Sequence, residues 1–271
     1  MTHLVVSLLV AALVAGGIAW LAWRAAALSP SGGWAAWGVG TVIFGLGGWR
    51  WALLLLAFFL SSSALTRLFQ RRKQTLEEKF EKGGRRDAAQ VLANGGLAAL
   101  LAVLYAFWPQ AAWIWAAGAA SLAAVNADTW ATELGVLNPS PPRLITNGRV
   151  VERGTSGGVS FYGLLAASAG ASGIGLLAAA LSPQPLLPGE VAPYALRISL
   201  AGFVGALVDS LFGATLQAVY HCPRCAKETE KHPLHTCGAP TVLQRGWRWL
   251  NNDVVNFLCA LSGAITILFL R

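Results

Sequence analysis

The segment 126–135, NADTWATELG, carries two carboxylates at the end of the apolar run 111–125. An ionisable side chain at membrane depth costs about 2.5–3.5 kcal/mol on insertion scales and is by default a candidate for function. At about 100° per residue, Asp128 and Glu133 point about 140° apart on a regular helix. We therefore expect a break or bend that lines a cavity, with Asp128 on a metal or nucleotide and Glu133 orienting its neighbours. The alternatives are that one carboxylate faces a metal and the other a structural partner, or that a buried ion pair joins two helices.

Five of the twelve acidic residues lie within or at the ends of apolar helices, whereas the other seven fall in loops. The five are Asp87, Asp128, Glu133, Asp209 and Asp253. In the helix of Asp209, Gly205, Gly213 and Gln217 continue a stripe at every fourth residue, and small residues at that spacing let helices pack closely. No membrane-embedded lysine is available to Asp209, and hard cations take carboxylate oxygens while leaving positions for substrate phosphates. We therefore predict magnesium on Asp128, Asp209 and Asp253, with Glu133 among the catalytic acids.

Polar residues also enter the apolar helix that begins near residue 88. Asp87, Gln90 and Asn94 recur at i, i+3 and i+7, so they line one helical face. Unpaired amides in an apolar environment are penalised, which predicts partners for this stripe. The alternative for Asp87 is a simple helix cap, with Arg85 and Arg86 anchoring the interface.

The last helix opens with NNDVVN, residues 251–256. An asparagine cap with an acid in the first turn is ordinary helix chemistry. Capping does not explain Asn252 and Asn256, which are neighbours at i, i+4 on an otherwise apolar helix. We expect these two, together with Asn126, among the residues that bind nucleotide or phosphate.

The loop RGTSGGVS, residues 153–160, leads into another apolar helix. Glycines and hydroxyls before a helix N-terminus offer backbone N–H donors and a positive dipole end, which suit a phosphate. The candidate residues are Arg153, Thr155, Ser156, Gly158 and Ser160. The loop lacks the Gly-Lys-Ser/Thr of a Walker A motif, and a plain helix cap is the alternative.

A further loop contains Cys222-Pro-Arg-Cys225, followed by His232, His235 and Cys237. This spacing predicts a structural zinc site of three cysteines and one histidine, with His235 preferred over His232. A reduced metal-free loop or a redox pair is the alternative. Cys259 lies in the last helix and is expected to pack.

The composition predicts an integral membrane protein. The chain of 271 residues is 55% hydrophobic and 12% charged, against roughly 25% charged residues in soluble domains. Apolar runs predict helices near 3–27, 35–48, 51–66, 88–107, 111–134, 158–181, 195–220 and 251–270. The result is a single all-α domain over 1–271, a polytopic bundle of seven or eight helices. The first run, 4–23, reads as a retained helix rather than a signal peptide, because its core is too long.

The basic residues predict orientation. Sixteen of the 20 Lys and Arg lie in the segments 67–86, 143–153 and 224–248, which places the loops 66–86 and 221–248 in the cytoplasm of a prokaryotic cell by the positive-inside rule. The active site should then face the cytoplasm, while the Pro-rich loop 182–193 faces out. The positive charge is concentrated in these loops, where it indicates the membrane orientation and nearby acidic lipid. We therefore expect no nucleic-acid partner. The centre of the first loop, 75–82, is either an amphipathic surface helix or a solvated connector.

The ordered motifs RRDAAQVLANGG, NADTWATELG, RGTSGGVS, GALVDSLFGATLQ and NNDVVN resemble the integral membrane family that includes plant phytyl-phosphate kinase and animal transmembrane protein 19. They are more distantly similar to the dolichol kinase, phytol kinase and phosphatidate cytidylyltransferase group, whose chemistry uses CTP and magnesium. The resemblance implies that Asp128 and Glu133 lie at a metal–nucleotide site and that Asp209 and Asp253 complete the acidic cluster. It implies phosphate contacts from the glycine loop, and makes Arg85 and Arg86 candidates for a lipid or nucleotide phosphate.

Three functions follow as hypotheses. The first is a magnesium-dependent kinase that transfers a phosphoryl group from CTP or another nucleotide to an isoprenoid monophosphate in the membrane. The second is a transporter or flippase for a lipid phosphate, which would often show inverted repeats; no clear internal symmetry is visible. The third is a cytidylyltransferase acting on a lipid phosphate. The lipid chain, the nucleotide base and the oligomeric state are left open.

Overall fold

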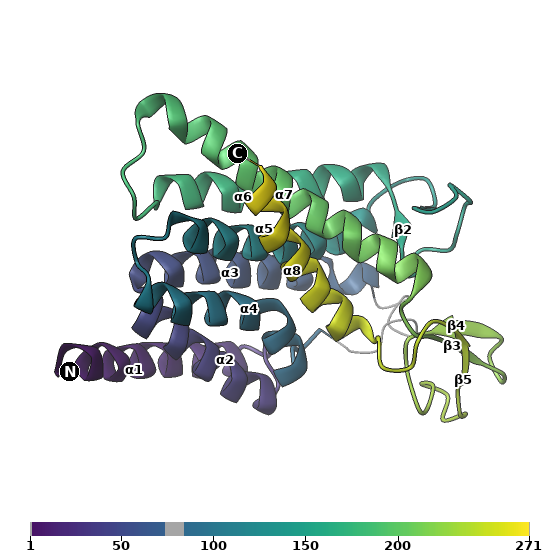
Figure 1. Ribbon diagram of the computed structural model, residues 1–271. Helices are drawn as coiled ribbons and strands as arrows, with labels where there is room; N and C mark the ends of the chain where they lie inside the picture. Colours follow the sequence, from purple (N-terminus) through teal and green to yellow (C-terminus); the bar gives the residue numbers. More distant parts are fainter. Residues whose placement is uncertain (1, 74–83, 271) are drawn as a thin grey trace.

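The computed structural model describes residues 2–73 and 84–270. The expected surface helix at 75–82 lies outside the described residues. Within them the protein is a helical bundle, as predicted (Figure 1). The segment expected to be a Cys/His loop forms a small β unit at one end. The helices are α1 (Thr2–Arg24), α2 (Pro30–Val42), the π-helical turn η1 (Ile43–Gly47), α3 (Trp49–Lys73), α4 (Ala88–Phe107), α5 (Ala112–Gly135), α6 (Phe161–Ala180), α7 (Pro188–Thr215) and α8 (Asn252–Phe269).

The strands are short. An antiparallel pair joins β1 (Arg143–Leu144) to β2 (Gly158–Val159). A three-stranded antiparallel sheet of order β4-β3-β5 is formed by β3 (Val219–Cys222), β4 (Lys227–Thr229) and β5 (Val242–Arg245). This sheet and its loops are called the β3–β5 unit below.

Helix α5 is the axis of the bundle. It packs against α3, α4, α6, α7 and α8, and every residue from 114 to 127 is buried. Its many alanines allow this, because small side chains let neighbouring helices approach closely. At Gly205 on α7 a Cβ would lie 2.5 Å from that of Ala124, and at Gly263 on α8 it would lie 2.7 Å from the carbonyl oxygen of Ala120. The close-packing role predicted for Gly205 is therefore confirmed.

Helix α5 is also unbroken. A break within 126–135 is wrong, because one continuous α-helix runs from Ala112 to Gly135. The helix places Asp128 and Glu133 on different faces, and each carboxylate has its own neighbours. The need for a break rested on both carboxylates facing one metal. They instead line one cavity from different faces of α5, Asp128 beside Asp209 of α7 and Glu133 beside Thr66 of α3.

Several helix boundaries differ from expectation. Helix α3 continues to Lys73, into the segment expected to be a loop. Helix α7 begins at Pro188, inside the expected Pro-rich loop, because proline at the first helical position sacrifices no hydrogen bond. The second and third helices form a hairpin that reverses at Gly48, where φ is +84°.

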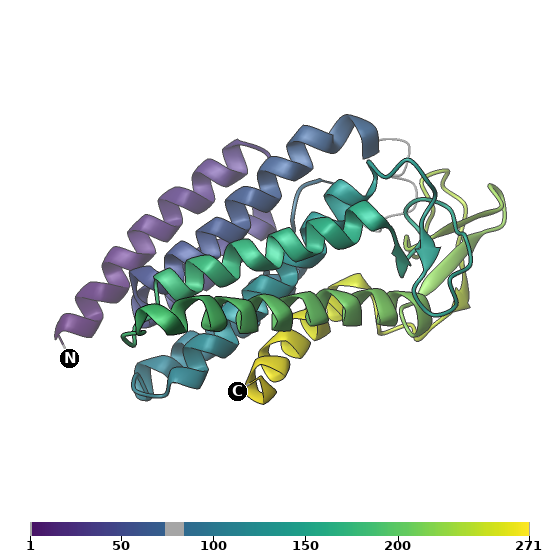
Figure 2. The same cartoon turned by 90° about the horizontal axis from the view of Figure 1, so that it is seen from above.

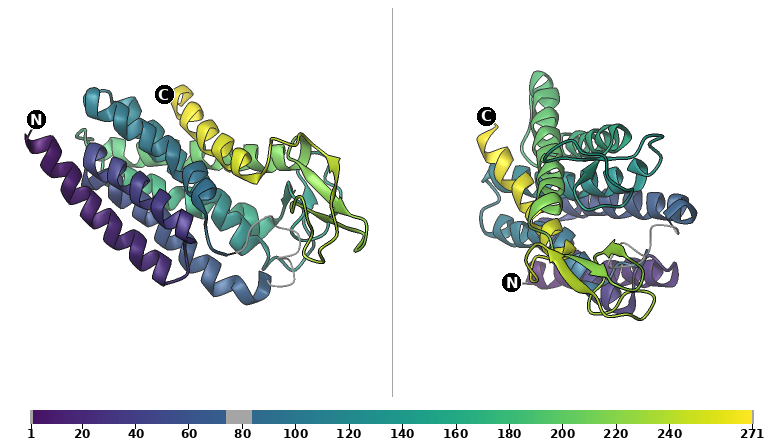
Figure 3. Two further views of the ribbon diagram at one scale, coloured as in Figure 1. Left: turned by 90° about the horizontal axis from the view of Figure 1, so that it is seen from below. Right: turned by 90° about the vertical axis from the view of Figure 1, so that its right-hand side faces the viewer.

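Six helices in the described ranges are long and apolar enough to cross a membrane: α1, α3, α4, α6, α7 and α8. Helix α5 is as long but carries its polar segment inside the bundle. The segments 136–160 and 216–251 lie together at one end, as seen from above in Figure 2, and both chain ends lie away from that end (Figure 3). The described residues thus contain eight α-helices, and the number of membrane spans stays a prediction.

Candidate functional site

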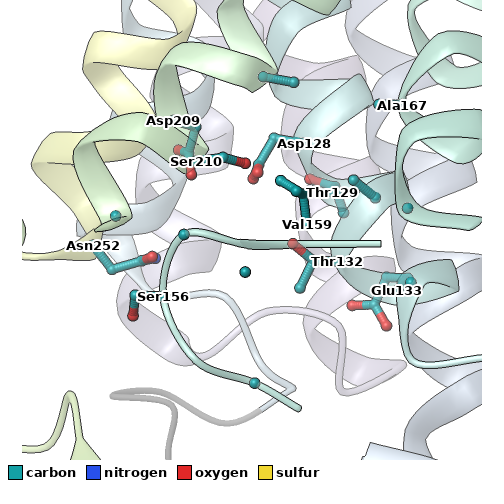
Figure 4. A pocket seen from close by; sticks show the side chains of 18 of the residues that line it. Asp128, Thr129, Thr132, Glu133, Ser156, Val159, Ala167, Asp209, Ser210 and Asn252 are labelled. Carbon is teal, nitrogen blue, oxygen red and sulfur yellow. The ribbon is translucent and has the colours of Figure 1, made fainter. Parts of the chain in front are cut away.

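A polar cavity of about 330 Å³ lies at the end of the bundle near the β3–β5 unit. Its walls come from α3 to α8, the glycine loop 153–160 and Glu230 of the β3–β5 unit. Figure 4 shows the part of the wall around Asp128 and Asp209. It gathers most of the residues singled out from the sequence: Arg86, Gln90, Asn94, Asp128, Glu133, Arg153, Thr155, Ser156, Gly158, Ser160, Asp209, Gln217, Asn252 and Asn256. Motifs up to 170 residues apart in the chain thus line one space.

Asp128 and Asp209 form the acidic centre of the cavity. They project from α5 and α7, and their carboxyl groups face and interact with each other. The Oδ2 atom of Asp209 is buried and has no hydrogen-bond partner among the described residues. Two carboxylates this close repel each other unless they share a proton or bind a cation. The pair can therefore share a proton or hold a divalent cation.

The glycine loop closes the cavity opposite this pair. Gly157 has φ +81°, a left-handed conformation that favours glycine, and a Cβ there would clash with the backbone of Ala214. A Cβ at Gly213 would in turn lie 2.8 Å from the Gly157 nitrogen. Both glycines are therefore needed for the loop to pack on the end of α7. Close packing also explains why Gly213 continues the stripe of Asp209.

Ser160 is the N-cap of α6, and its hydroxyl accepts a hydrogen bond from the Gly163 nitrogen at 3.1 Å. The helix-cap alternative is thus correct for Ser160. The same residue lines the cavity, so the N-terminus of α6 points its dipole toward the space. Arg153 lines the cavity as well, while its guanidinium donates to the carbonyl oxygens of Asn138 and Pro139.

Glu133 belongs to a second polar group, on the α3 and α4 side of the cavity. Its Oε1 accepts a hydrogen bond from the Thr66 hydroxyl at 2.9 Å. The Arg86 guanidinium donates to the Ser63 hydroxyl at 3.1 Å and is attracted by Glu133. Burial lowers the pKa of Arg86 to about 10, and the Glu133 carboxylate opposes this shift. Arg86 therefore stays charged at neutral pH and offers a fixed cation to an anion in the cavity.

The helix starts follow ordinary capping. Asp87 caps α4 by accepting from the Gln90 nitrogen at 3.0 Å, and Gln90 Oε1 accepts from the Asp87 nitrogen at 3.2 Å. The cap alternative for Asp87 is therefore correct, and Asp87 does not line the cavity. Asn251 caps α8 by accepting from the Val254 nitrogen, which leaves Asn252 and Asn256 on the cavity wall.

Three further predicted residues lie elsewhere. Asn126 is buried, donates to the Gly170 carbonyl at 2.8 Å and accepts from the Ser61 hydroxyl at 3.1 Å, so it joins α5 to α6 and α3. Asp253 is buried in the first turn of α8 but is not part of the cavity wall. Arg85 is exposed and likewise lies outside this cavity.

Sequence reasoning missed several polar residues of the wall: Thr66, Thr129, Thr132, Ser210 and Glu230. Thr129 and Thr132 sit one helical turn from Glu133 and Asp128, a signal that could have found them. Ser210 directly follows Asp209, and Thr66 lies on α3 without a singled-out acid nearby in the sequence. Glu230 was assigned to a loop, and only the folded β3–β5 unit brings it to the cavity.

The four predicted zinc ligands converge in the β3–β5 unit. One ligand atom from each of Cys222, Cys225, His235 and Cys237 lies within 4.8 Å of the others. Cys222 and Cys237 sulfurs are 3.6 Å apart, and His235 Nδ1 is 3.2 Å from the Cys237 sulfur. The contact with His235 lowers the pKa of Cys237 to about 6, which favours the thiolate that metals bind.

His232 is not in this cluster. Its ring stacks on Tyr220 with centroids 4.4 Å apart, so the preference for His235 agrees with the geometry. Cys259 is buried in α8 and packs there, as expected.

The chain matches the family described as Integral membrane protein DUF92 over residues 13–264. The chain belongs to this family. Similar DUF92 relatives include Protein PGR of Arabidopsis thaliana, 36% identical over 94% of this chain and 92% of the relative. The uncharacterized membrane protein sll0875 of Synechocystis is 31% identical over 88% and 80%. Protein VTE6, chloroplastic, of Arabidopsis thaliana is 26% identical over 90% and 65%. No solved structure is significantly similar to the chain.

Membership of DUF92 confirms the resemblance inferred from the five motifs, and with it the integral membrane class. Relatives occur in plants, a cyanobacterium and an archaeon.

Proposed function

We propose that this DUF92 protein is a membrane phosphotransferase that moves a phosphoryl group from a nucleoside triphosphate, CTP by preference, to an isoprenoid monophosphate. The observation that carries the proposal is the facing pair Asp128 and Asp209, opposite a glycine-hydroxyl loop in one cavity. The motif resemblance to the family that includes plant phytyl-phosphate kinase supports the same reaction.

The residues of the cavity fit magnesium. Asp209 presents a buried carboxylate oxygen without a hydrogen-bond partner in the described chain, and Asp128 supplies a second carboxylate beside it. Magnesium is bound by one or two carboxylates together with substrate phosphates. When bound at Asp128 and Asp209, magnesium would neutralise charge on the transferring phosphoryl group.

The remaining wall suits two phosphate groups. The Thr155 hydroxyl and the N-terminus of α6 would face the nucleotide phosphates. The Ser156 hydroxyl already donates to Glu230, and the backbone N–H groups of Thr155 and Gly158 donate within the loop, so these groups hold the loop in shape. Arg86 lies on the α4 side, and its fixed cation would hold the acceptor phosphate. Because the glycine loop lacks a lysine, charge neutralisation would come from arginine or from magnesium.

In the reaction, an oxygen of the acceptor monophosphate attacks the γ-phosphorus of the nucleotide. The bond from the γ-phosphorus to the β–γ bridging oxygen breaks, and the nucleoside diphosphate leaves. The acceptor is already an anion and needs no strong general base. Positioning and charge neutralisation therefore supply most of the acceleration, which explains a site built from carboxylates, hydroxyls and arginines.

The test is product analysis with purified protein in detergent or nanodiscs. Protein, magnesium, labelled CTP or ATP and a panel of prenyl monophosphates are incubated together. A prenyl diphosphate with a nucleoside diphosphate supports the proposal. A CMP-linked lipid with pyrophosphate would instead establish a cytidylyltransferase. No turnover with any donor, together with lipid-phosphate movement in liposomes, would establish a transporter.

We also propose that Cys222, Cys225, His235 and Cys237 bind a structural zinc ion. Four ligand atoms within 4.8 Å of one another and the CxxC spacing support this. The ligands come from β3, from the turn that follows it and from the turn at 235–238. Zinc would join these segments in a β3–β5 unit that contains only short strands.

A further inference from the structure

A second cavity, of about 300 Å³, lies between α1, α2, α3 and α4. It is called the apolar groove. Its wall includes Ile18 of α1, Val39 of α2, Leu56 of α3 and Val91 of α4. Of all its lining side chains in the described residues, three are polar: Arg86, Gln90 and Asn94.

Those three polar residues are shared with the site cavity. The two spaces therefore adjoin at the start of α4, with these three residues between them. The Arg86 guanidinium lies at this junction, 5.6 Å from the ring centroids of both Phe58 and Phe59, which line the groove. Arg86 thus presents a cation between a polar space and an apolar one.

The helix arrangement keeps the groove open. Helix α3 packs chiefly on α5 and η1, while α2 packs on α1 and α4. Among the described residues α3 makes few direct contacts with α4, and the groove occupies this region. The π-helical turn η1 places Phe44 on its wall, and such turns frequently occur at functional sites.

We infer that the apolar groove binds the isoprenoid chain of the acceptor, with its phosphate beside Arg86 at the mouth of the site cavity. The inference rests on the proposed function. An amphiphile with a phosphate at one end matches a groove that is apolar along its length and cationic where it joins the site. A volume of about 300 Å³ is within the roughly 300–1,000 Å³ typical of ligand pockets. Burial of the isoprenoid chain would supply affinity for the lipid. Attraction to Arg86 would ensure that the phosphate end of the lipid faces the site.

The direct test is photoaffinity labelling, which needs no turnover. Purified full-length protein in nanodiscs is irradiated with a diazirine-bearing geranylgeranyl monophosphate, and the adducts are mapped by mass spectrometry. We expect adducts on groove residues of α1 to α4, and competition by unlabelled geranylgeranyl monophosphate. Adducts on outward-facing residues such as Leu13, which is 78% exposed, or labelling without competition, would overturn the inference. If the groove is labelled but no phosphotransfer is detected, the assignment of the groove as a lipid-binding site stands and the proposed kinase activity is overturned.

A matched pair of variants tests the groove by filling it. Ala36→Phe on α2 adds a ring to the groove wall, whereas Gly38→Phe on the same helix adds it where a Cβ meets nothing within 4 Å. Ala36→Phe should lower the labelling that unlabelled lipid can compete away by at least about tenfold. A tenfold loss of affinity corresponds to losing the burial of about two methylene groups of the lipid. Gly38→Phe should label as the wild type does. Equal labelling of both variants would contradict the inference.

If Ala36→Phe does not fold, Ala52→Phe on α3 fills the same groove. Chain length provides a second readout. With either filled variant, the affinity for a C20 monophosphate should fall while that for a C5 monophosphate stays within about twofold. Equal losses for both lengths would show that the groove does not hold the chain.

Discussion

Glu230 accepts a hydrogen bond from the hydroxyl of Ser156 at 2.7 Å. The two residues belong to different units, Glu230 to the β3–β5 unit and Ser156 to the glycine loop. The same Glu230 oxygen accepts from Gln217 Nε2 at 2.7 Å. Arg245 of β5 reinforces the contact by donating to the carbonyl oxygens of Gly213 at 2.9 Å and Ser156 at 3.4 Å. The β3–β5 unit therefore holds the glycine loop in place.

Glu230→Ala should weaken this hold. Removal of the carboxylate leaves Ser156 and Gln217 without their acceptor, and a hydrogen bond to a charged group contributes about 1.5–3 kcal/mol. We expect turnover to fall by about tenfold or more, which corresponds to about 1.4 kcal/mol in the barrier. The control is Glu190→Gln, an exposed acid at the N-terminal end of α7, far from the glycine loop. Equal kinetics in the two variants would show that Glu230 does not position the loop.

The two histidines of the β3–β5 unit separate metal binding from packing. His235→Ala should lose bound zinc, measured by mass spectrometry of the purified protein, because it removes one of four ligands. His232→Ala should retain zinc, because that ring stacks on Tyr220 outside the cluster. Zinc retained in His235→Ala and lost in His232→Ala would reverse the assignment. A wild-type protein without zinc would contradict the site altogether.

The affinity for a prenyl monophosphate should depend on the charge of Arg86. Its pKa of about 10 lies above neutrality, so the side chain is protonated below that pH and loses its charge as pH rises through it. The KM for the lipid phosphate should be constant from about pH 7 to 9 and rise above about pH 10.

Arg86→Lys moves this limit in a defined direction. An ammonium begins with a pKa near 10.4, and burial lowers it further. The rise in KM should therefore begin at lower pH than in the wild type, while Glu133 opposes the shift in both. A KM profile that does not move in Arg86→Lys would show that another group holds the phosphate.

Much of the site could be predicted from the sequence, because polar residues in apolar helices are costly and therefore informative. Asp128, Asp209, Asn252 and the glycine loop were found in this way, and the structure brings them to one cavity. The unbroken course of α5 was not predicted, since the sequence does not show that Glu133 has its own partners, Thr66 and Arg86.

Contacts between distant loops also escaped prediction. Glu230 reads as an ordinary loop acid until β3 pairs with β4 and turns it toward Ser156. From the sequence, Asp87 could equally be a site residue or a helix cap. In the structure its carboxylate accepts a hydrogen bond from the Gln90 nitrogen, which identifies it as the cap. The groove could not be inferred from hydropathy, because groove-lining and lipid-facing side chains are both apolar.

The most direct measurement is the rate of prenyl diphosphate formation in Asp128→Asn and Asp209→Asn. Each change keeps the side-chain size and removes one carboxylate of the facing pair. The matched control is Glu190→Gln, which alters an exposed acid at the opposite end of α7. We predict magnesium-dependent diphosphate formation by the wild type and the control, and a loss of about 100-fold or more in each aspartate variant. Diphosphate formed at the wild-type rate by both aspartate variants would contradict the account.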